Sequence, residues 1–335
     1  MAKTGGHNGR VGVQAQAKVN KLSAWHPLEG VCCCLKEKMG FKSGFVSIIG
    51  RPNVGKSTLL NSLVGQKVAI ISDKPQTTRH RIRSVLTTPQ AQIVFVDTPG
   101  IHKPKHRLGQ MMVDSALGTI GDVDLILMVV DADKASGPGD EFILEKLKGT
   151  KTPVILVINK VDRVEKPQLL PLISFFSKQF DFTEIVPVSA RTGENLDRLL
   201  PLMIGYLPEG PQYYPEDVVT DQPENLILSE LVREKVLWLT RQEVPHSVAV
   251  VIDEVRDGEK GVKVIRATIY VERDSQKVIL IGQGGEMMKQ IGQKARVEIE
   301  KTLGMKVFLE LWVKVKPGWR QNERALQDFG FDRQG

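Results

Sequence analysis

The chain has 335 residues, 41% of them hydrophobic and 25% charged, and its formal net charge is +7. It is long enough for two domains, and its hydrophobic fraction is ordinary for a globular protein. No apolar run approaches the ~20 residues that a transmembrane helix needs, so no integral membrane segment is expected. The moderate basic excess fits a protein that works near polyanions as well as one that is merely soluble.

Residues 1–42 differ from the rest because they are rich in Gly, Lys and Gln and show little periodicity. The three cysteines, Cys32, Cys33 and Cys34, are consecutive, so they can neither form a metal cage by themselves nor link distant elements. The remainder of the chain contains no cysteine, which suits a protein in a reducing cytosol. The segment is not convincing as a signal peptide. We expect either a disordered targeting tail or a spurious extension upstream of a translation start at Met39.

A short apolar run, residues 45–49, predicts a buried parallel strand, and Gly50 to Ser57 then fits the pattern GxxxxGK[ST] before a helix that begins near Thr58. Such a loop aims backbone N–H groups at phosphates, while Lys56 reaches the β- and γ-phosphates and Ser57 ligates Mg²⁺. A chance glycine turn is the alternative, and the strand–loop–helix context argues against it. The predicted phosphate-side residues are Gly50, Asn53, Val54, Gly55, Lys56, Ser57 and Thr58.

The polar segment 72–81 predicts a mobile loop in which Thr77 or Thr78 completes the Mg²⁺ shell when GTP is bound. The strand predicted at residues 92–96 ends in Asp97-Thr98-Pro99-Gly100. Asp97 can hold a Mg²⁺ water and the Gly100 N–H can sense the γ-phosphate, although in isolation this stretch could be an ordinary turn. Ras-like enzymes have a glutamine at the next position, where this chain has Ile101, so intrinsic hydrolysis should be slow unless backbone, metal or a partner places the water.

A third strand, residues 154–158, precedes Asn159-Lys160-Val161-Asp162. Asp162 can accept from both N1–H and the 2-amino group of guanine, a donor pair that adenine lacks. Asn159 should brace neighbouring loops and Lys160 can lie along the base. The backbone N–H groups of Ser189 and Ala190 should approach guanine O6. Alone this motif could be a surface loop, but its order and spacing predict a GTP site.

Residues 207–223 are rich in Pro and Gly and predict a linker. Beyond it we expect a helix at 226–241, strands at 246–255 and 262–271, a helix–GxxG–helix unit and a strand at 307–316. This α-β-β-α-α-β order is typical of a KH domain, whose GxxG loop clamps a single-stranded nucleic acid. The glycines could instead simply join two packed helices. The predicted RNA-binding residues are Gly282, Gln283, Gly284, Gly285, Lys289, Lys294 and Arg296.

The stretches GRPNVGKSTLLN, KPQTTRHRI, VDTPG, NKVD, IGQGG, IGQKAR and LELWVKVKPGW together resemble the Era-like family of bacterial GTPases. The resemblance implies an α/β P-loop GTPase domain with a mostly parallel sheet and helices on both faces, followed by an α+β type II KH domain. It implies a GTPase domain at 43–206, a linker at 207–223, a KH domain at 224–320 and a C-terminal tail at 321–335. It also favours Thr78 over Thr77, because Thr78 directly precedes Arg79 as in related GTPases.

The resemblance further implies GTP hydrolysis with Lys56, Thr78 and Gly100 as catalytic residues, and Mg²⁺ held by Ser57, Thr78 and Asp97. K⁺ stimulation through Asn53 is an additional hypothesis. The implied partners are the 3′ end of 16S ribosomal RNA and the 30S subunit, for a monomeric cytoplasmic protein that can associate peripherally with the inner membrane. Two alternatives stay open: an RNA-binding scaffold with a structural nucleotide site, and a P-loop kinase or ATPase.

Overall fold

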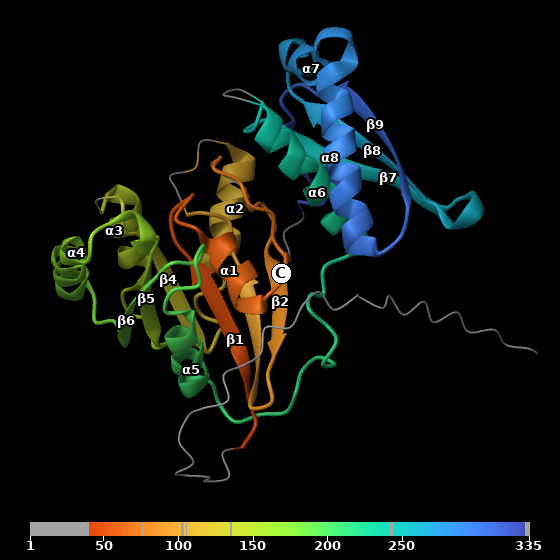
Figure 1. Cartoon of the computed structure of the whole chain (residues 1–335). Helices are drawn as coiled ribbons and strands as arrows, with labels where there is room; N and C mark the ends of the chain where they lie inside the picture. Colours follow the sequence, from red (N-terminus) through yellow and green to blue (C-terminus); the bar gives the residue numbers. More distant parts are fainter. Residues whose placement is uncertain are drawn as a thin grey trace, which may run out of the picture.

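The computed structural model describes residues 40–331, apart from 75–76, 102–103, 105, 135 and 241–243. The predicted start at Met39, the three cysteines and most of the predicted N-terminal extension lie outside the described residues. The described chain folds into two units, each of which combines one of two sheets with helices (Figure 1).

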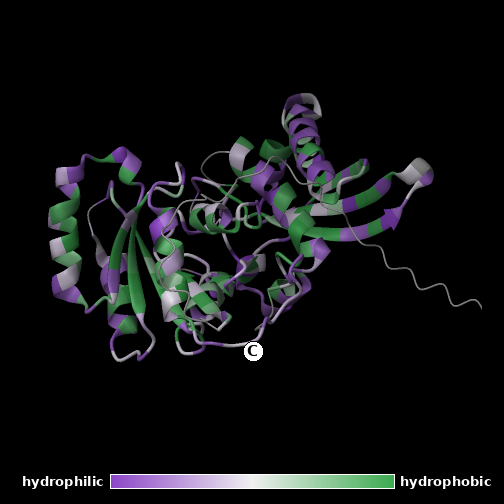
Figure 2. Ribbon diagram, turned by 60° about the horizontal axis from the view of Figure 1, so that its bottom comes forward, coloured by the Kyte–Doolittle hydropathy of each residue, from purple (hydrophilic) through white to green (hydrophobic). Residues whose placement is uncertain are grey.

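The larger sheet is mostly parallel, with strand order β2-β3-β1-β4-β5-β6. Only β2 runs antiparallel to its neighbour β3. Its strands are β1 (Lys42–Ile49), β2 (Ile82–Thr87), β3 (Ala91–Asp97), β4 (Leu125–Asp131), β5 (Val154–Asn159) and β6 (Glu184–Val188). The central strands are buried on both faces, so they are hydrophobic over most of their length rather than alternating (Figure 2).

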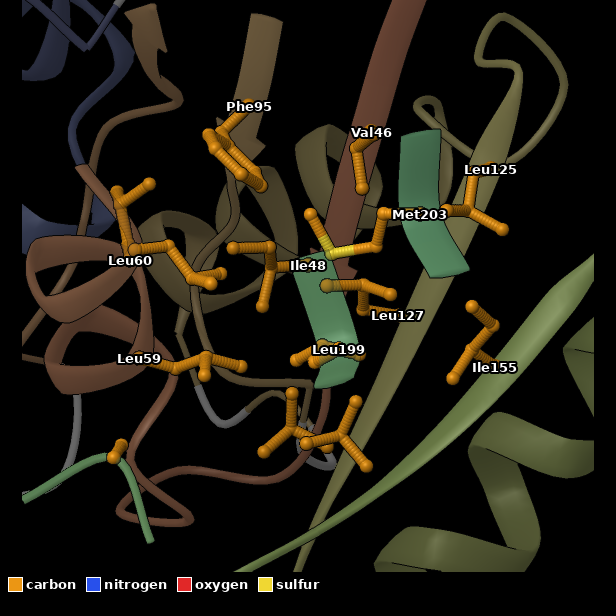
Figure 3. Packing of buried hydrophobic residues seen from close by; sticks show 14 of the residues in the cluster. Val46, Ile48, Leu59, Leu60, Phe95, Leu125, Leu127, Ile155, Leu199 and Met203 are labelled. Atoms are coloured by element: carbon orange, nitrogen blue, oxygen red, sulfur yellow. The ribbon is translucent and has the colours of Figure 1, made fainter. Parts of the chain in front are cut away.

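Helices cover both faces of this sheet, as parallel connections require. They are α1 (Lys56–Val64), α2 (Arg107–Leu117), α3 (Pro138–Leu147), α4 (Lys166–Gln179) and α5 (Leu196–Tyr206). On one face, Leu59 and Leu60 of α1 and Leu199 and Met203 of α5 pack against Ile48 and other strand residues (Figure 3). The opposite face packs against α2, α3 and α4. The predicted P-loop type of α/β domain is confirmed.

The smaller sheet has the order β7-β8-β9, with an antiparallel β7–β8 pair and a parallel β8–β9 pair. The elements are α6 (Glu224–Leu239), β7 (Ala249–Asp257), β8 (Lys263–Val271), α7 (Asp274–Ile281), α8 (Glu286–Leu303) and β9 (Val307–Val315). One core contains residues of all three helices and all three strands. The predicted α-β-β-α-α-β order of a KH domain is confirmed.

Two boundaries differ from the expected ones around Pro245. The helix α6 ends at Leu239 rather than at 241, and β7 begins at Ala249 rather than at 246. Proline lacks the backbone N–H that helices and sheet ladders use, and it disfavours the helical conformation of the residue before it. The chain instead forms a turn here, in which Ser247 N–H donates to Val244 O at 3.0 Å.

The segment expected to be a C-terminal tail contains a short helix, α9 (Glu323–Asp328), after a 3₁₀ turn. Apolar residues of this segment form a hydrophobic cluster that joins the two domains. Trp319 and Leu326 are fully buried in it and pack with Leu108 and Met112 of α2. Within the range that the structure describes, no helix is long and apolar enough to cross a membrane.

Candidate functional site

The loop between β1 and α1 is shaped by glycine. Gly55 has φ +99°, and a Cβ added there would lie 2.3 Å from Asn159 Nδ2. Only glycine therefore lets this loop pass so close to the carboxyl end of β5. The helix α1 begins immediately afterwards, at Lys56, so its N-terminal N–H groups face the same loop.

Lys56 lies inside the curve of this loop. Its ammonium group donates to the backbone oxygens of Gly50 and Arg51, both at 3.1 Å. Burial lowers the pKa of Lys56 to about 8, although the negative charge of Asp97 opposes the shift. The loop thus holds a nearly buried cation among backbone dipoles, an environment that suits a phosphate group.

Three predicted Mg²⁺ ligands come together beside Lys56. Ser57 Oγ lies 2.8 Å from Thr78 Oγ1 and 3.1 Å from Asp97 Oδ2, and Thr78 Oγ1 lies 3.3 Å from the same carboxylate oxygen. Thr77 turns away and donates to Lys74 O at 2.6 Å.

The chemistry of this cluster fits Mg²⁺, which prefers hard oxygen ligands. Burial raises the pKa of Asp97 to about 6. Among the described residues, Asp97 Oδ1 is buried and has no hydrogen-bond partner. A buried carboxylate oxygen without a donor is costly unless a cation satisfies it.

The loop after β3 touches the phosphate loop directly. A Cβ on Gly100 would lie 2.8 Å from backbone atoms of Pro52, so a larger residue would push the two loops apart. Ile101 N–H donates to Gly50 O at 3.1 Å, and the Ile101 side chain is 1% exposed in the core. The position that holds glutamine in Ras-like enzymes thus anchors the loop in this chain.

Asn159 and Lys160 brace the base side of the site. Asn159 Nδ2 donates to Val54 O at 2.9 Å, and the Ala190 N–H donates to Asn159 Oδ1 at 3.0 Å. Lys160 Nζ donates to Asn53 O at 2.7 Å. The bracing expected of Asn159 is therefore present, whereas the Ala190 N–H that was expected to approach guanine O6 bonds to Asn159 here.

Asp162 faces the loop after β6, where Ser189 Oγ donates to its Oδ1 at 2.7 Å. Its second oxygen lies 3.6 Å from Arg191 Nε. The carboxylate is therefore held at the edge of the same loop that carries Ala190. A cavity beside the phosphate loop is lined by residues predicted for the phosphate and Mg²⁺ side, among them Asn53, Gly55, Lys56, Ser57, Thr58, Thr78 and Gly100. Asn159, Asp162 and Ala190 do not line it.

Two acidic residues that support this site were not predicted from the sequence. Asp131, at the end of β4, accepts from Lys160 Nζ at 2.6 Å, and Asp140 pairs with Arg51 at 2.8 Å. Asp131 carried the same signal as Asp97, since both follow an apolar strand at the same edge of the sheet. Asp140, in the first turn of α3, carried no comparable signal.

The GxxG loop forms the junction of α7 and α8. Gly282, Gly284 and Gly285 have φ of +72°, +59° and +80°, a region that favours glycine. Beside it lies a groove of about 400 Å³ between α8 and β9. It is lined by Gly285, Met288, Lys289, Gly292, Gln293, Arg296, Phe308, Leu309 and Leu311.

The groove includes only part of the predicted RNA-binding set. Lys289 and Arg296 line it, seven residues apart on one face of α8, whereas Lys294 lies off that face and outside the lining. Gly282, Gln283 and Gly284 form the adjoining loop without lining the groove. Phe308, which the sequence analysis did not select, is 58% exposed at its margin.

The first domain has the features of a P-loop GTPase: a mostly parallel sheet that carries a phosphate loop, a hydroxyl–carboxylate cluster and a base-side carboxylate. A KH domain follows it. The chain matches the family described as 50S ribosome-binding GTPase over residues 45–160 and the KH domain family over 243–320. It is 58% identical over 291 residues to the GTPase Era of Heliobacterium modesticaldum, a match covering 87% of this chain and 97% of that protein.

Two solved structures are similar over 87% of this chain and 99% of theirs. One, an Era in complex with MgGDPNP and nucleotides 1506–1542 of 16S ribosomal RNA, has a TM-score of 0.85 and 47% identity. The other, an Aquifex aeolicus Era variant bound to GDP and aluminium fluoride, has a TM-score of 0.84 and 46% identity. The chain belongs to the Era family of GTPases, and it is a GTP-binding enzyme that hydrolyses GTP.

Proposed function

We propose that this GTPase binds the 3′ end of 16S ribosomal RNA through its KH domain and assists assembly of the 30S subunit. The observation that carries the proposal is the groove between α8 and β9, where a GxxG loop adjoins Lys289 and Arg296. A relative that is 47% identical holds nucleotides 1506–1542 of that RNA. Glycine permits close approach of the RNA backbone, and the two cations complement its phosphates.

In the nucleotide site we assign Lys56 to the β- and γ-phosphates and Asp162 to the guanine edge. Ser57, Thr78 and Asp97 would hold Mg²⁺, which neutralises charge on the phosphates when bound. The Gly100 backbone would meet the γ-phosphate. Because Ile101 is buried, we infer that no side chain at this position orients the attacking water, so that backbone, metal or a partner must do so.

Asn53 supports the hypothesis of K⁺ stimulation. Its side chain crosses from the phosphate loop to the loop that carries Thr78, where Nδ2 donates to Asp73 O at 2.7 Å. Its amide oxygen and the Asp73 carbonyl oxygen are the kinds of ligand that coordinate alkali cations. Turnover measured in K⁺ and in Na⁺ tests the idea, and equal rates would remove it.

We further propose that GTP gates RNA binding through the packing of the two domains. Both neighbours of Thr78 contact the KH domain: Thr77 O accepts from Arg233 of α6, and Arg79 donates to Val248 O at 2.5 Å and to Pro245 O at 3.1 Å. In this arrangement Thr78 lies beside Ser57 and Asp97, so a movement of Thr78 away from the nucleotide site must strain or break bonds to the KH domain.

The loop after Gly100 has a corresponding connection on its other side. It leads into α2, where Arg107 pairs with Glu323 of α9 at 2.8 Å. The preceding His106 lies 3.1 Å from Arg320. Both loops expected to respond to the γ-phosphate thus bond to elements that belong to the KH domain or follow it, which supports a coupled movement.

The test is the affinity for an RNA copying the 3′ end of 16S ribosomal RNA, measured with a GTP analogue, with GDP and without nucleotide. Tighter binding with the analogue is expected. A Gly284→Asp variant, which adds charge and a side chain to the GxxG loop, should bind weakly in every state. Equal affinities in the three states would reject gating, and weak binding by the unaltered protein would reject the RNA target.

We also propose the domain limits 43–206, 207–223 and 224–320, with a monomer acting in the cytoplasm and able to associate peripherally with the inner membrane. The bounds of α5, which ends at Tyr206, and α6, which begins at Glu224, support the limits. Co-sedimentation with 30S subunits and with membranes, together with light scattering, would test the partners, the location and the oligomeric state.

A further inference from the structure

The outward face of the KH sheet carries two large exposed aromatic side chains on its edge strand. Along β9 the residues alternate: Leu309, Leu311 and Val313 pack into the core, and the residues between them point the other way. Phe308 and Trp312 both lie on this outward face and are 58% and 57% exposed. They are four residues apart, so their backbones are separated by about 13 Å.

The end of this outward face near Tyr270 and Ala249 is already covered. Tyr270 of β8 packs against Phe329, with ring centroids 4.5 Å apart and ring planes tilted by 34°, and Ala249 of β7 is buried in the same cluster. The C-terminal segment therefore seals the part of the face nearest the GTPase domain. The part formed by β9 has no such cover in the described chain, and burying its two aromatic rings would remove a large apolar area from water.

This exposed part is continuous with the candidate RNA groove. Phe308 lines the groove together with Arg296, although its position in the β9 alternation places it on the outward face. Among the strands that the structure describes, β9 pairs only with β8, so it forms an edge of the sheet. A single strand that leaves the groove would therefore reach the outward face by passing this edge.

The charges favour RNA over an acidic or neutral partner. Residues 277–320 contain nine Lys or Arg and four Glu. The carboxylate between the two rings, Glu310, is paired with Arg266 at 2.7 Å, and Arg266 also pairs with Glu254 at 2.7 Å. Arg256 also pairs with Glu254 at 3.2 Å, so two guanidinium groups oppose these two carboxylates and weaken their repulsion of a phosphate backbone.

We propose that single-stranded RNA extends from the groove onto this face and stacks bases on Phe308 and Trp312. The inference rests on the proposed RNA binding and adds a second contact region to it. Aromatic rings stack on any base, so the face would add affinity for a longer strand with little sequence preference, while the groove supplies its own contacts.

The experiment compares two RNAs copying the 3′ end of 16S ribosomal RNA, one of about four nucleotides, which the GxxG loop can clamp, and one of roughly twelve. Full-length protein and a Trp312→Ala variant are titrated with both. Stacking of one base predicts a loss of about 5- to 150-fold for the long RNA and no loss for the short one. Trp312→Phe should restore most of the affinity, and Phe142→Ala, which removes an exposed aromatic ring of α3, is the matched control.

The outcomes separate the two proposals. A loss confined to the long RNA, restored by Trp312→Phe, supports the stacking surface. Equal affinity of wild-type protein and Trp312→Ala for the long RNA overturns it while leaving groove binding in place. If Trp312→Ala lowers self-association instead of RNA affinity, the face binds a second copy and the proposal is wrong. If the unaltered protein binds neither RNA, the proposed RNA function itself fails.

Discussion

Replacing Arg79 with leucine should uncouple the two domains. The guanidinium is 3% exposed and donates to two backbone oxygens across the interface, those of Val248 and Pro245. It also lies 6.0 Å from the ring of Trp319. Leucine retains apolar bulk, but it leaves both carbonyl groups without their donor in a site that water enters poorly.

The size of the effect can be worked out from these contacts. Hydrogen bonds from a charged donor contribute about 1.5–3 kcal/mol each, so two of them amount to about 3–6 kcal/mol. The net loss in the variant is smaller than this, because leucine removes the unfavourable burial of the guanidinium. The same burial lowers the pKa of Arg79 to about 9. A net loss of about 3 kcal/mol would shift the ratio of docked to undocked molecules by about 150-fold.

The assay is energy transfer between dyes on Glu145→Cys of α3 and Lys301→Cys of α8, with Cys32, Cys33 and Cys34 changed to serine. Arg79→Leu should broaden the distance distribution and reduce the dependence of RNA affinity on nucleotide. Arg83→Leu is the matched control, because Arg83 is nearly half exposed and its 3.5 Å pair with Asp221 lies at the surface. An unchanged distance distribution in Arg79→Leu would refute the reasoning.

Three further changes test other parts of the structure. Ile101→Gln should lower the free energy of unfolding by about 2–4 kcal/mol in urea titrations without accelerating hydrolysis, because it buries an amide in an apolar cluster; faster hydrolysis would show that the side chain reaches the site. Asp162→Asn should reduce the preference for GTP over ATP at least ~100-fold in competition binding; an unchanged preference would place guanine elsewhere. Burial tends to raise the pKa of Glu272, but the hydrogen bond and charge of Arg320 outweigh it and lower this pKa below 4.5. The carboxylate therefore stabilises the fold above pH 4.5 and loses this effect as pH falls through its folded pKa, so Arg320→Gln should cost less stability in acid than at neutral pH.

The convergence of the nucleotide motifs could be predicted because each follows an apolar strand. Parallel strands carry their carboxyl ends to one edge of the sheet, so Asp97 and Asn159 had to lie near the loop after β1. Asp131 obeys the same rule and could have been found in the same way. Helical periodicity also separates Arg296 from Lys294, since only the former shares a face of α8 with Lys289.

Other features depend on contacts that no local pattern encodes. Thr77 and Thr78 are adjacent and chemically identical, and the residues alone do not say which one faces Ser57. Tertiary contacts from Arg233 and Arg79 fix the backbone on either side of Thr78. The burial of the C-terminal segment was likewise not predicted, because its apolar residues are few and gain their partners only when α2 and β7 come together.

The position of Thr78 between two interdomain contacts gives the proposed gating a thermodynamic form. The backbone that docking of the KH domain holds at Thr77 and Arg79 also places the Thr78 hydroxyl beside Ser57. The free energy that docking contributes to holding these residues must therefore appear in the affinity for nucleotide. Coupling of this kind is reciprocal, and typical values of about 1–3 kcal/mol correspond to about 5- to 150-fold. Suppose that RNA binds one arrangement of the domains better than the other. Replacing GDP by the GTP analogue then changes the affinity for RNA by some factor, and RNA must change the ratio of the affinities for the analogue and for GDP by the same factor. A one-sided effect on equilibrium affinities cannot arise from this interface.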